Sequence, residues 1–512
     1  MKRISLVSNE GVDPRRWWTL LVLCLSLLVI GLDNTILNVA LPTMQRDLDA
    51  SSSQLQWIVD VYMLVFAGVL LTAGSLGDRF GRKRALSLGL AVFGLGSLGS
   101  ALAGSPELLI VMRGLMGIGG ALIMPSTLSI LTATFPAHER GKAIGIWSGV
   151  SGIGIAIGPV AGGWLIEHAS WSWIFLVNLP IVAVALIAGR FLVPESRDES
   201  KPKLDPRGFV LSFVALTSLV WGLIEAPSRG WTDGLVLGSF AFAAAMLTAF
   251  IVWERRAPAP MLDLQLFRNP RFSASSASIS LAFFALFGVI FFLTQYLQEV
   301  RGYSALDAGL RTLPVAAGLV VGGPFSAKLT ERLGIRIVVP FGLTTVAAAL
   351  FLLTYADATS GYGLIAFTLV LLGFGMASAL APATDAIMGS LPPAKMSVGS
   401  AINDTTRVAG GALGVAVLGS ILASGYRGDM DSAVASLPPQ ARDIAQDSLA
   451  GGLAVAERLG DGRLAATAQD AFLSGMHAAA LVAAAVALAG ALVAAIFLPS
   501  REPAAVREVV PA

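Results

Sequence analysis

Ionisable side chains stand inside long apolar runs of this chain. Asp33 lies within GLDNTILNVALP, Asp60 within QWIVDVYMLVF, and Arg113 within a third run. Asp404 and Arg407 share a fourth run and stand three residues apart, so a helix would place them on one face. A charge at the middle of a membrane helix costs about 2.5–3.5 kcal/mol on insertion scales, which makes each position a functional candidate.

An aspartate that faces an arginine could control a proton. Burial away from water favours the neutral carboxyl group, whereas a nearby arginine, which keeps its own charge, favours the carboxylate. The proton affinity of Asp33 facing Arg113 would then depend on hydration and distance, and both change when a transporter rocks. We predict that Asp33 and Arg113 form a proton-coupled switch, with Asp60 and Asp404 as further coupling residues. A purely structural polar anchor is the alternative for each aspartate.

Aromatic and thioether side chains near these charges could hold a cargo. Trp57 stands three residues before Asp60 and could share its face, and an aromatic surface beside a carboxylate attracts a flat cation. Met124, Phe291 and Phe292 could supply adaptable apolar walls. Side chains that face lipid are the alternative for each. The predicted substrate-binding set is Asp33, Asp60, Trp57, Met124, Phe291 and Phe292.

Long apolar helices must position these residues. The 512 residues are 55% hydrophobic and only 13% charged, with a mean hydropathy of +0.75, whereas soluble domains carry about 25% charge. A helix that spans a membrane needs about 20 apolar residues. On that criterion we predict an all-α membrane protein with fourteen spans at 17–40, 54–75, 84–103, 107–131, 142–165, 172–193, 208–224, 234–253, 273–298, 307–329, 337–355, 361–386, 397–424 and 472–498.

The distribution of charge predicts the orientation and excludes some partners. Most of the 35 lysines and arginines fall in segments on the side of the N-terminus, so both termini should be cytoplasmic. The net charge of +2 gives no reason to expect a nucleic-acid partner, and the single cysteine, Cys24, excludes an intramolecular disulfide. The three histidines have no spacing that suggests a metal site.

An internal repeat divides the chain into two halves. TERLGIR (330–336) follows the tenth span as GDRFGRK (77–83) follows the second, which indicates two six-helix halves with two extra spans between them. Within the second half, 425–471 is predicted as an external helical hairpin, with a poorly ordered loop as the alternative. The predicted divisions are 1–193, a six-helix bundle; 194–271, linkers and two extra spans; 272–498, a second six-helix bundle; and 499–512, a cytoplasmic tail.

Two kinds of segment predict gating. The short loop GSLGDRFGRKR joins spans two and three with an acid, four bases and closely spaced glycines, and its equivalent in the second half is degenerate. The fifth span, SGIGIAIGPVAGGWL, combines a face of glycines with a proline that invites a kink. The predicted gating residues are Gly74, Asp78, Arg79, Gly81, Arg82, Glu331, Arg332, Gly154, Gly158, Pro159 and Gly162.

Several of these motifs resemble those of the fourteen-span drug:proton antiporters of the major facilitator superfamily. LDNTILNVALP, RGLMGIGGA, WSWIFLVNLP and the loop after the second span carry the resemblance, and G-x-x-x-G-P-x-x-G-G resembles the signature of proton-driven exporters. The resemblance implies a monomeric pump without a cofactor, driven by protons, in a bacterial cytoplasmic membrane. It also implies export of lipophilic, mainly cationic drugs, with membrane lipids around the helices and Asp78 bracing the outward-open state against a helix end.

Other functions stay open on the sequence. The natural cargo could be an endogenous metabolite, lipid or siderophore, with drugs as incidental passengers. A proton-coupled importer is disfavoured by the fifth span, and a non-transporting receptor or scaffold by the deep charges. Direct use of ATP is disfavoured because no phosphate-cradling G-x-x-x-x-G-K-[ST] segment is present.

Overall fold

A computed structural model describes residues 15–196, 205–258, 260–391 and 396–499 of the chain. These residues form helices and connecting turns, with no strand among them. The predicted cytoplasmic tail, 499–512, lies outside the described residues except for Pro499. The first half comprises α1 (Arg16–Asp47), α2 (Ser52–Phe80), α3 (Arg82–Ala101), α4 (Pro106–Thr134), α5 (Ala137–His168), α6 (Trp173–Leu176) and α7 (Asn178–Leu192).

Two long helices and the second half follow. The pair between the halves is α8 (Pro206–Arg229) and α9 (Gly234–Glu254). The second half comprises η1 (Leu266–Arg268), α10 (Pro270–Gln295), the π-helix η2 (Tyr296–Val300), α11 (Ala305–Thr312), α12 (Pro314–Leu333), α13 (Ile335–Leu353), α14 (Tyr362–Gly389), α15 (Met396–Val434), α16 (Pro439–Asp447), α17 (Leu449–Leu459) and α18 (Gly462–Phe497).

Each predicted span coincides with a helix or a helix pair. Thirteen of these segments, among the described residues, are long and apolar enough to cross a membrane. The remaining predicted span, 142–165, lies within α5, which is not among the thirteen. The prediction of an all-helical, multi-pass protein is confirmed, and the count of fourteen stays a prediction.

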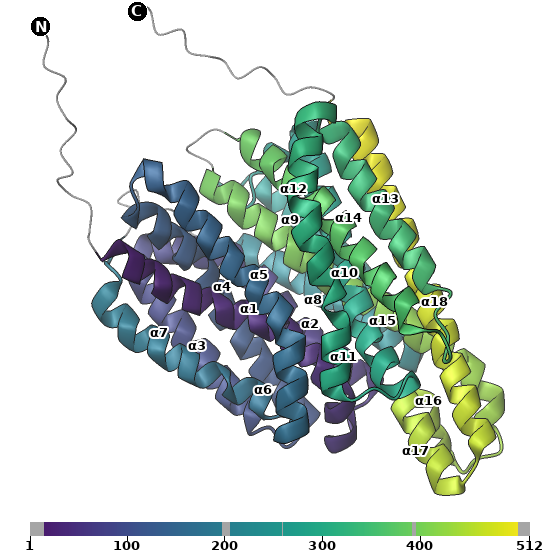
Figure 1. The fold of residues 1–512 in the computed structure, drawn as a ribbon. Helices are drawn as coiled ribbons and strands as arrows, with labels where there is room; N and C mark the ends of the chain where they lie inside the picture. The colour runs from purple at the N-terminus through teal and green to yellow at the C-terminus, as the bar shows by residue number, and fades with distance from the viewer. Residues whose placement is uncertain (1–14, 197–204, 259, 392–395, 500–512) are drawn as a thin grey trace, which may run out of the picture.

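The extra helices pack at the seam between the two halves. The halves contact each other through α2 with α15, α5 with α11, and α1 with α10. α8 packs against both α2 and α15, and α9 packs on α8 (Figure 1). A phenylalanine of α8 fills the space beside Gly68 of α2, where an added methyl would lie 2.6 Å from the Phe213 ring. The extra pair therefore covers one side of the α2–α15 contact.

The repeat seen in the sequence ends a helix with a glycine of positive φ in both halves. Gly81 ends α2 with φ of 117°, and Gly334 ends α12 with φ of 78°. Residues other than glycine rarely adopt positive φ, so each turn depends on its glycine. The N–H of Gly81 donates to the Gly77 carbonyl and that of Gly334 to the Thr330 carbonyl, each at 2.9 Å. The two turns are equivalent although their charges differ.

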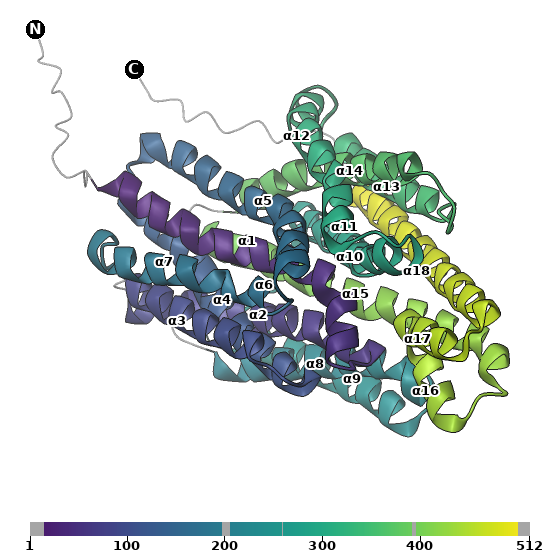
Figure 2. The same cartoon turned by 60° about the horizontal axis from the view of Figure 1, so that its bottom comes forward.

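The two ends of the helical body differ in how closely the halves approach. We call the end that holds Arg16 and Phe497 the terminal end, and the opposite end, which holds α16 and α17, the distal end (Figures 1 and 2). Near the distal end the Gln298 side chain donates to the Val39 carbonyl at 2.8 Å, and the Leu306 N–H donates to the Glu167 carboxylate at 2.9 Å. Both hydrogen bonds join one half to the other.

Toward the terminal end the same helices separate. A methyl added at Gly145 or Gly149 of α5 would meet no atom within 4 Å, and Val320 and Val321 of α12 are 73% and 62% exposed. The halves are therefore closed at the distal end and apart on the side of the chain termini.

The glycine face of α5 packs on α1. A methyl added at Gly158 would lie 3.0 Å from the Leu32 carbonyl oxygen of α1, and one at Gly154 would lie 3.1 Å from the Leu28 carbonyl oxygen. Such contacts are closer than ordinary side chains allow, so the two helix backbones approach only because glycine stands there. α1 and α5 therefore pack as a tight pair beside the seam.

Candidate functional site

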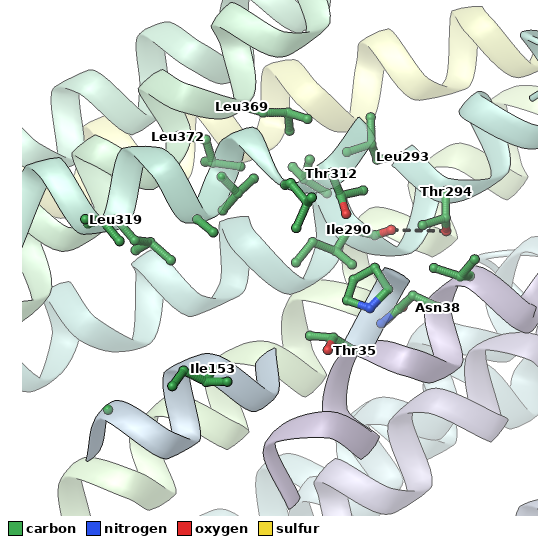
Figure 3. A pocket seen from close by; sticks show the side chains of 18 residues that line it. Thr35, Asn38, Ile153, Ile290, Leu293, Thr294, Thr312, Leu319, Leu369 and Leu372 are labelled. Carbon is green, nitrogen blue, oxygen red and sulfur yellow. Dashed lines mark hydrogen bonds between the residues drawn. The ribbon is translucent and has the colours of Figure 1, made fainter. Parts of the chain in front are cut away.

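A cavity of about 390 Å³ lies between the halves, below the distal closure. Its eighteen lining residues come from α1 and α5 on one side and from α10, α11, α12 and α14 on the other, with Leu313 between α11 and α12. Figure 3 shows Thr35 and Asn38 of α1 on one side of the cavity and Leu319, Leu369 and Leu372 on the other. The site thus includes side chains from both halves.

The cavity walls are mainly aliphatic. No aspartate, glutamate, lysine or arginine is among its eighteen lining residues, all of which the structure describes. Polar groups come from four positions, Thr35, Asn38, Thr294 and Thr312. Because the Thr294 hydroxyl donates to the Ile290 carbonyl of its own helix, its hydrogen-bonding capacity is partly used. Such a surface suits a lipophilic molecule with a few neutral polar groups.

Asp33 and Arg113 form a buried ion pair next to this cavity. Nη1 of Arg113 lies 2.6 Å from Oδ2 of Asp33, and the two side chains are 2% and 0% exposed. Nε of Arg113 donates to the Ile58 carbonyl at 3.1 Å, and its guanidinium stands 4.4 Å from the centre of the Tyr62 ring. The arginine therefore links α4 to both α1 and α2.

Among the described residues, only one carboxyl oxygen of Asp33 has a hydrogen-bond partner, and the side chain does not line the cavity. Its Oδ1 atom is buried and has no hydrogen-bond partner in the described part of the chain. Thr35 and Asn38 line the cavity from the same helix, whereas Asp33 is not among the lining residues. The ion pair therefore lies behind the cavity wall in this conformation, only a turn of α1 from the cavity.

Asp60 is buried at the seam between the halves. Its side chain is fully buried and neither carboxyl oxygen has a hydrogen-bond partner among the described residues. Gln56 and Met63, about one turn before and after it on α2, both contact glycines of α15. A methyl at Gly419 would lie 2.9 Å from Gln56, and one at Gly411 would lie 3.6 Å from the Met63 sulfur.

Asp404 and Arg407 form a looser pair in the second half. Their closest charged atoms are 3.8 Å apart, and the side chains of Asp404 and Arg407 are 14% and 30% exposed. Arg407 also donates to the Thr384 hydroxyl at 3.1 Å and stands 5.6 Å from the centre of the Phe283 ring. The structure brings this pair together on one face of α15, apart from the lining of the cavity.

The predicted cargo-binding residues lie outside the cavity in this conformation. Trp57 packs against a small cluster formed mainly by α8 and α15, and Met124 packs on the core of the first half. Phe292 is buried in the core of the second half. Phe291 packs on the first half and lines a separate small pocket near the distal end. None of them, nor Asp33 or Asp60, is among the cavity's lining residues.

The predicted gating residues at the terminal end form local contacts. Asp78 accepts a hydrogen bond from Arg82 at 2.7 Å, and Arg82 also donates to the Ser129 carbonyl at the end of α4. Arg79 is exposed and stands over the Phe80 ring. In the second half Glu331 and Arg332 are exposed and line a recess of about 640 Å³ at the terminal end. A methyl group added at Gly74 would lie 3.7 Å from the Pro125 side chain.

The remaining gating predictions fall on α5. Gly154, Gly158 and Gly162 face α1. Pro159 lines the cavity, and its carbonyl lies against Gly309 of α11. The glycine stripe thus forms the helix contact within the first half, and the proline beside it contacts the second half.

Sequence reasoning missed Thr35 and Asn38. These two residues are three positions apart in NTILN, so they share a helical face. Two polar side chains at that spacing in an apolar run were the available signal. Apart from Thr294, the lining residues of α10 and α14 carried no comparable signal, because leucine, isoleucine and valine suit a core, a lipid face and a cavity wall equally.

Known proteins match this chain along most of its length. The family model "Major Facilitator Superfamily" matches residues 23–415. The tetracenomycin C resistance and export protein of Streptomyces glaucescens is 38% identical, over 96% of this chain and 94% of that protein. The multidrug efflux pump LfrA of Mycolicibacterium smegmatis is also 38% identical, over 95% and 97%. The methyl viologen resistance protein SmvA of Salmonella typhimurium is 35% identical, over 86% and 89%.

A solved structure has the same fold. A bacterial homologue of the human lysosomal transporter Spinster, in an inward-facing and unoccupied conformation, matches with a TM-score of 0.67 at 19% identity, over 97% of this chain and all of that one. The predicted family and a multi-pass location in the bacterial cytoplasmic membrane are confirmed. The chain is a membrane transporter that belongs to the Major Facilitator Superfamily.

Proposed function

We propose that this protein is a proton-coupled exporter of lipophilic small molecules, drugs and dyes among them. The observation that carries the proposal is the buried Asp33–Arg113 pair one turn of α1 from a cavity shared by both halves. Relatives that match nearly the whole chain are described as a multidrug efflux pump and as a resistance and export protein. Export of small molecules by a monomer without a cofactor is the function that fits these features best.

Protonation would work through the geometry of the pair. When Asp33 is charged, Arg113 holds α4 against α1 with a charge-assisted hydrogen bond, and the unpaired Oδ1 can accept a proton. Protonation removes the ionic attraction and leaves Arg113 bound to the Ile58 carbonyl of α2. The proton therefore changes which helices are held together, and this change is a physical route from proton binding to rocking of the halves.

The closed distal end and separated terminal end correspond to an inward-open state when the termini are cytoplasmic. In that state cargo enters the apolar cavity from the cytoplasm or from the inner leaflet. Rocking would then open the distal end and close the terminal end, where Asp78 and Arg82 at the α2–α3 turn contact the end of α4. Alternation of these two states is what antiport requires.

Cationic cargo is the class we propose first. Asp60 is a buried carboxyl group without a hydrogen-bond partner among the described residues, and it lies at the seam that must open toward the distal side. A charged Asp60 would attract a lipophilic cation and a protonated Asp60 would release it. Protons and cation would then compete for one negative charge, as efflux driven by a pH gradient requires.

A neutral metabolite is the second candidate cargo. The cavity in this conformation is lined by apolar groups, threonines and one asparagine, without a charged side chain. A relative with 38% identity is described as an export protein for tetracenomycin C. A neutral cargo would bind through these walls alone, so its affinity would not depend on the carboxyl group of Asp60.

Ethidium efflux from proteoliposomes tests the proposal. Wild type, Asp33→Asn and Asp60→Asn are compared under an imposed pH gradient, with Asp429→Asn, an exposed position on α15, as the matched control. We expect the pH gradient to drive ethidium efflux by wild type and by the control. Asp33→Asn should show no increase in efflux when the gradient is imposed. Retention of full proton-driven efflux by Asp33→Asn would show that Asp33 is not the coupling residue.

A further inference from the structure

A line of polar residues on α2 leads from the distal surface to Asp60. Ser52, Gln56 and Asp60 stand four residues apart, so they lie on one face of the helix. Ser52 is partly exposed, Gln56 is 2% exposed and Asp60 is fully buried. The side-chain amide oxygen of Gln56 and both carboxyl oxygens of Asp60 are buried and have no hydrogen-bond partner among the described residues. Buried polar atoms normally have partners, so this line calls for an explanation.

Space for water lies beside this line. A small pocket of about 20 Å³ is lined by Ser52, Gln56, Gln295 and Asp447, among others, and about 10–15 Å³ is enough for one water molecule. Asp447 also lines a much larger recess of about 890 Å³ at the distal surface. The pocket and the recess therefore meet at Asp447 and Ser448, which line both.

The helices α16 and α17, which we call the distal hairpin, close the outer end of this line. The Ser52 N–H donates to the Asp447 carboxylate at 2.8 Å, and the Ser52 hydroxyl donates to the Asp447 carbonyl at 2.6 Å. Arg427 of α15 holds the same carboxylate at 2.8 Å. Tyr426 donates to the carbonyl of Ser448 at 2.8 Å. Asp447 thus joins the second half to the first residue of α2.

Charged groups surround the outer end of this line. The recess is lined by Arg46, Asp49, Arg427, Asp443, Asp447 and Arg458. Glu299 of η2 lines neither space but interacts electrostatically with Arg46 of the recess and Tyr426 of the pocket. No ion pair among the described residues includes Asp60, and both of its carboxyl oxygens are buried without a hydrogen-bond partner there. A proton that moves inward along the line therefore meets one free acceptor, the Asp60 carboxylate.

We propose that Ser52, Gln56 and Asp60 mark a proton-entry route from the distal side, and that the distal hairpin closes this route through Asp447. A water molecule that donates a hydrogen bond to the side-chain amide oxygen of Gln56 passes a proton to a carboxylate oxygen of Asp60. The water then regains a proton from water in the recess, so no charge is left on the route. This inference rests on the proposed proton-coupled function and adds a positioning residue, Gln56, and a gate, Asp447.

Thiol labelling tests the gate. The natural cysteine is first removed by Cys24→Ala, and Gln56→Cys is then labelled from outside intact cells with a charged methanethiosulfonate. Asp447→Ala removes a hydrogen bond and an ion pair, so we expect labelling to become about tenfold faster or more. Asp429→Ala, at an exposed position of α15 that lines neither the pocket nor the recess, should label at the parental rate. An unchanged rate in Asp447→Ala overturns the gate.

Proton-driven transport tests the relay. In proteoliposomes, Gln56→Leu should slow ethidium efflux under a pH gradient by about two- to tenfold, the factor that one lost hydrogen bond represents. Ethidium exchange without a gradient should remain at the wild-type rate, which also shows that the variant is folded. Gln440→Leu, the same change at an exposed position of the distal hairpin that lines neither the pocket nor the recess, should behave as wild type in both assays.

The outcomes separate this inference from the proposed function. If wild type itself shows no efflux driven by a pH gradient, the proposed function fails and the route fails with it. If wild type is driven by the gradient and Gln56→Leu is driven equally well, only the route is wrong. An equal loss of driven efflux and of gradient-free exchange in Gln56→Leu would also overturn the relay, because the glutamine would then serve packing or cargo.

Discussion

Arg113 and Asp33 come from α4 and α1, eighty residues apart in sequence, and meet at 2.6 Å where neither side chain is more than 2% exposed. A buried ion pair of this kind is weak evidence for stability, because removing two charges from water offsets most of their attraction. It is stronger evidence for a role that needs the charges, and movement of a proton on and off Asp33 is such a role.

Breaking this pair from one side should destabilise the protein. Arg113→Leu leaves a buried carboxyl group without its partner, and such changes cost about 3–5 kcal/mol in other proteins. We expect a clearly lower unfolding temperature in detergent, measured by tryptophan fluorescence, and partial recovery in the double variant Asp33→Asn/Arg113→Leu. Arg407→Leu, which removes a more exposed and longer pair, should lower the temperature less. Equal losses for the two single variants would contradict this ranking.

A methyl group at Gly158 should disturb the contact between α1 and α5. It would lie 3.0 Å from the Leu32 carbonyl oxygen and closer still to the Thr35 hydroxyl, and overpacking of this kind costs about 1–3 kcal/mol. We expect Gly158→Ala to slow ethidium efflux in proteoliposomes. Gly145→Ala is the matched control on the same helix, because its methyl would meet no atom within 4 Å. Similar rates for both variants would mean that the contact does not limit transport.

A carboxylate in the cavity should change which cargo binds. Asn38→Asp introduces a negative charge, of similar size to the amide, into a lining that has none. Charge attraction should tighten binding of ethidium, and the cost of burying a charge beside an uncharged molecule should weaken binding of a neutral aromatic cargo. Fluorescence titration of both ligands, with Asp429→Asn as a control for assay drift, measures the two shifts. Shifts of the same sign would place Asn38 outside the cargo site.

Loss of a distal contact between the halves should favour opening at that end. Gln298→Leu removes its hydrogen bond to the Val39 carbonyl, a contribution of about 0.5–1.5 kcal/mol, equivalent to a change of roughly two- to tenfold in the ratio of the two states. Spin labels at Lys142 and Lys328, both exposed and on opposite halves near the terminal end, report the change as a shorter distance. Gln440→Leu, at an exposed position of α16, is the matched control, and an unchanged distance distribution in Gln298→Leu contradicts the prediction.

Much of the architecture could be predicted because each part depends on local sequence. A run of about twenty apolar residues must be a helix in a membrane, since every backbone polar group has to be satisfied within the segment. The repeated loops could be recognised because each turn needs a glycine at positive φ, at Gly81 and again at Gly334. The partnership of Asp33 with Arg113 was predictable because a charge deep in a span needs a partner, and few were available.

The cavity and the distal gate required the tertiary structure. Which face of an apolar helix lines a cavity depends on the rotation and tilt of that helix against its neighbours, and a leucine is compatible with every choice, so Leu369 and Leu372 could not be assigned in advance. Ser52 and Asp447 are 395 residues apart, and their contact depends on how the two halves close. The sequence alone determined the helices, their repeat and their deep charges, because these depend on the solvent that surrounds each segment. Only packing decided which side chains face one another across the seam.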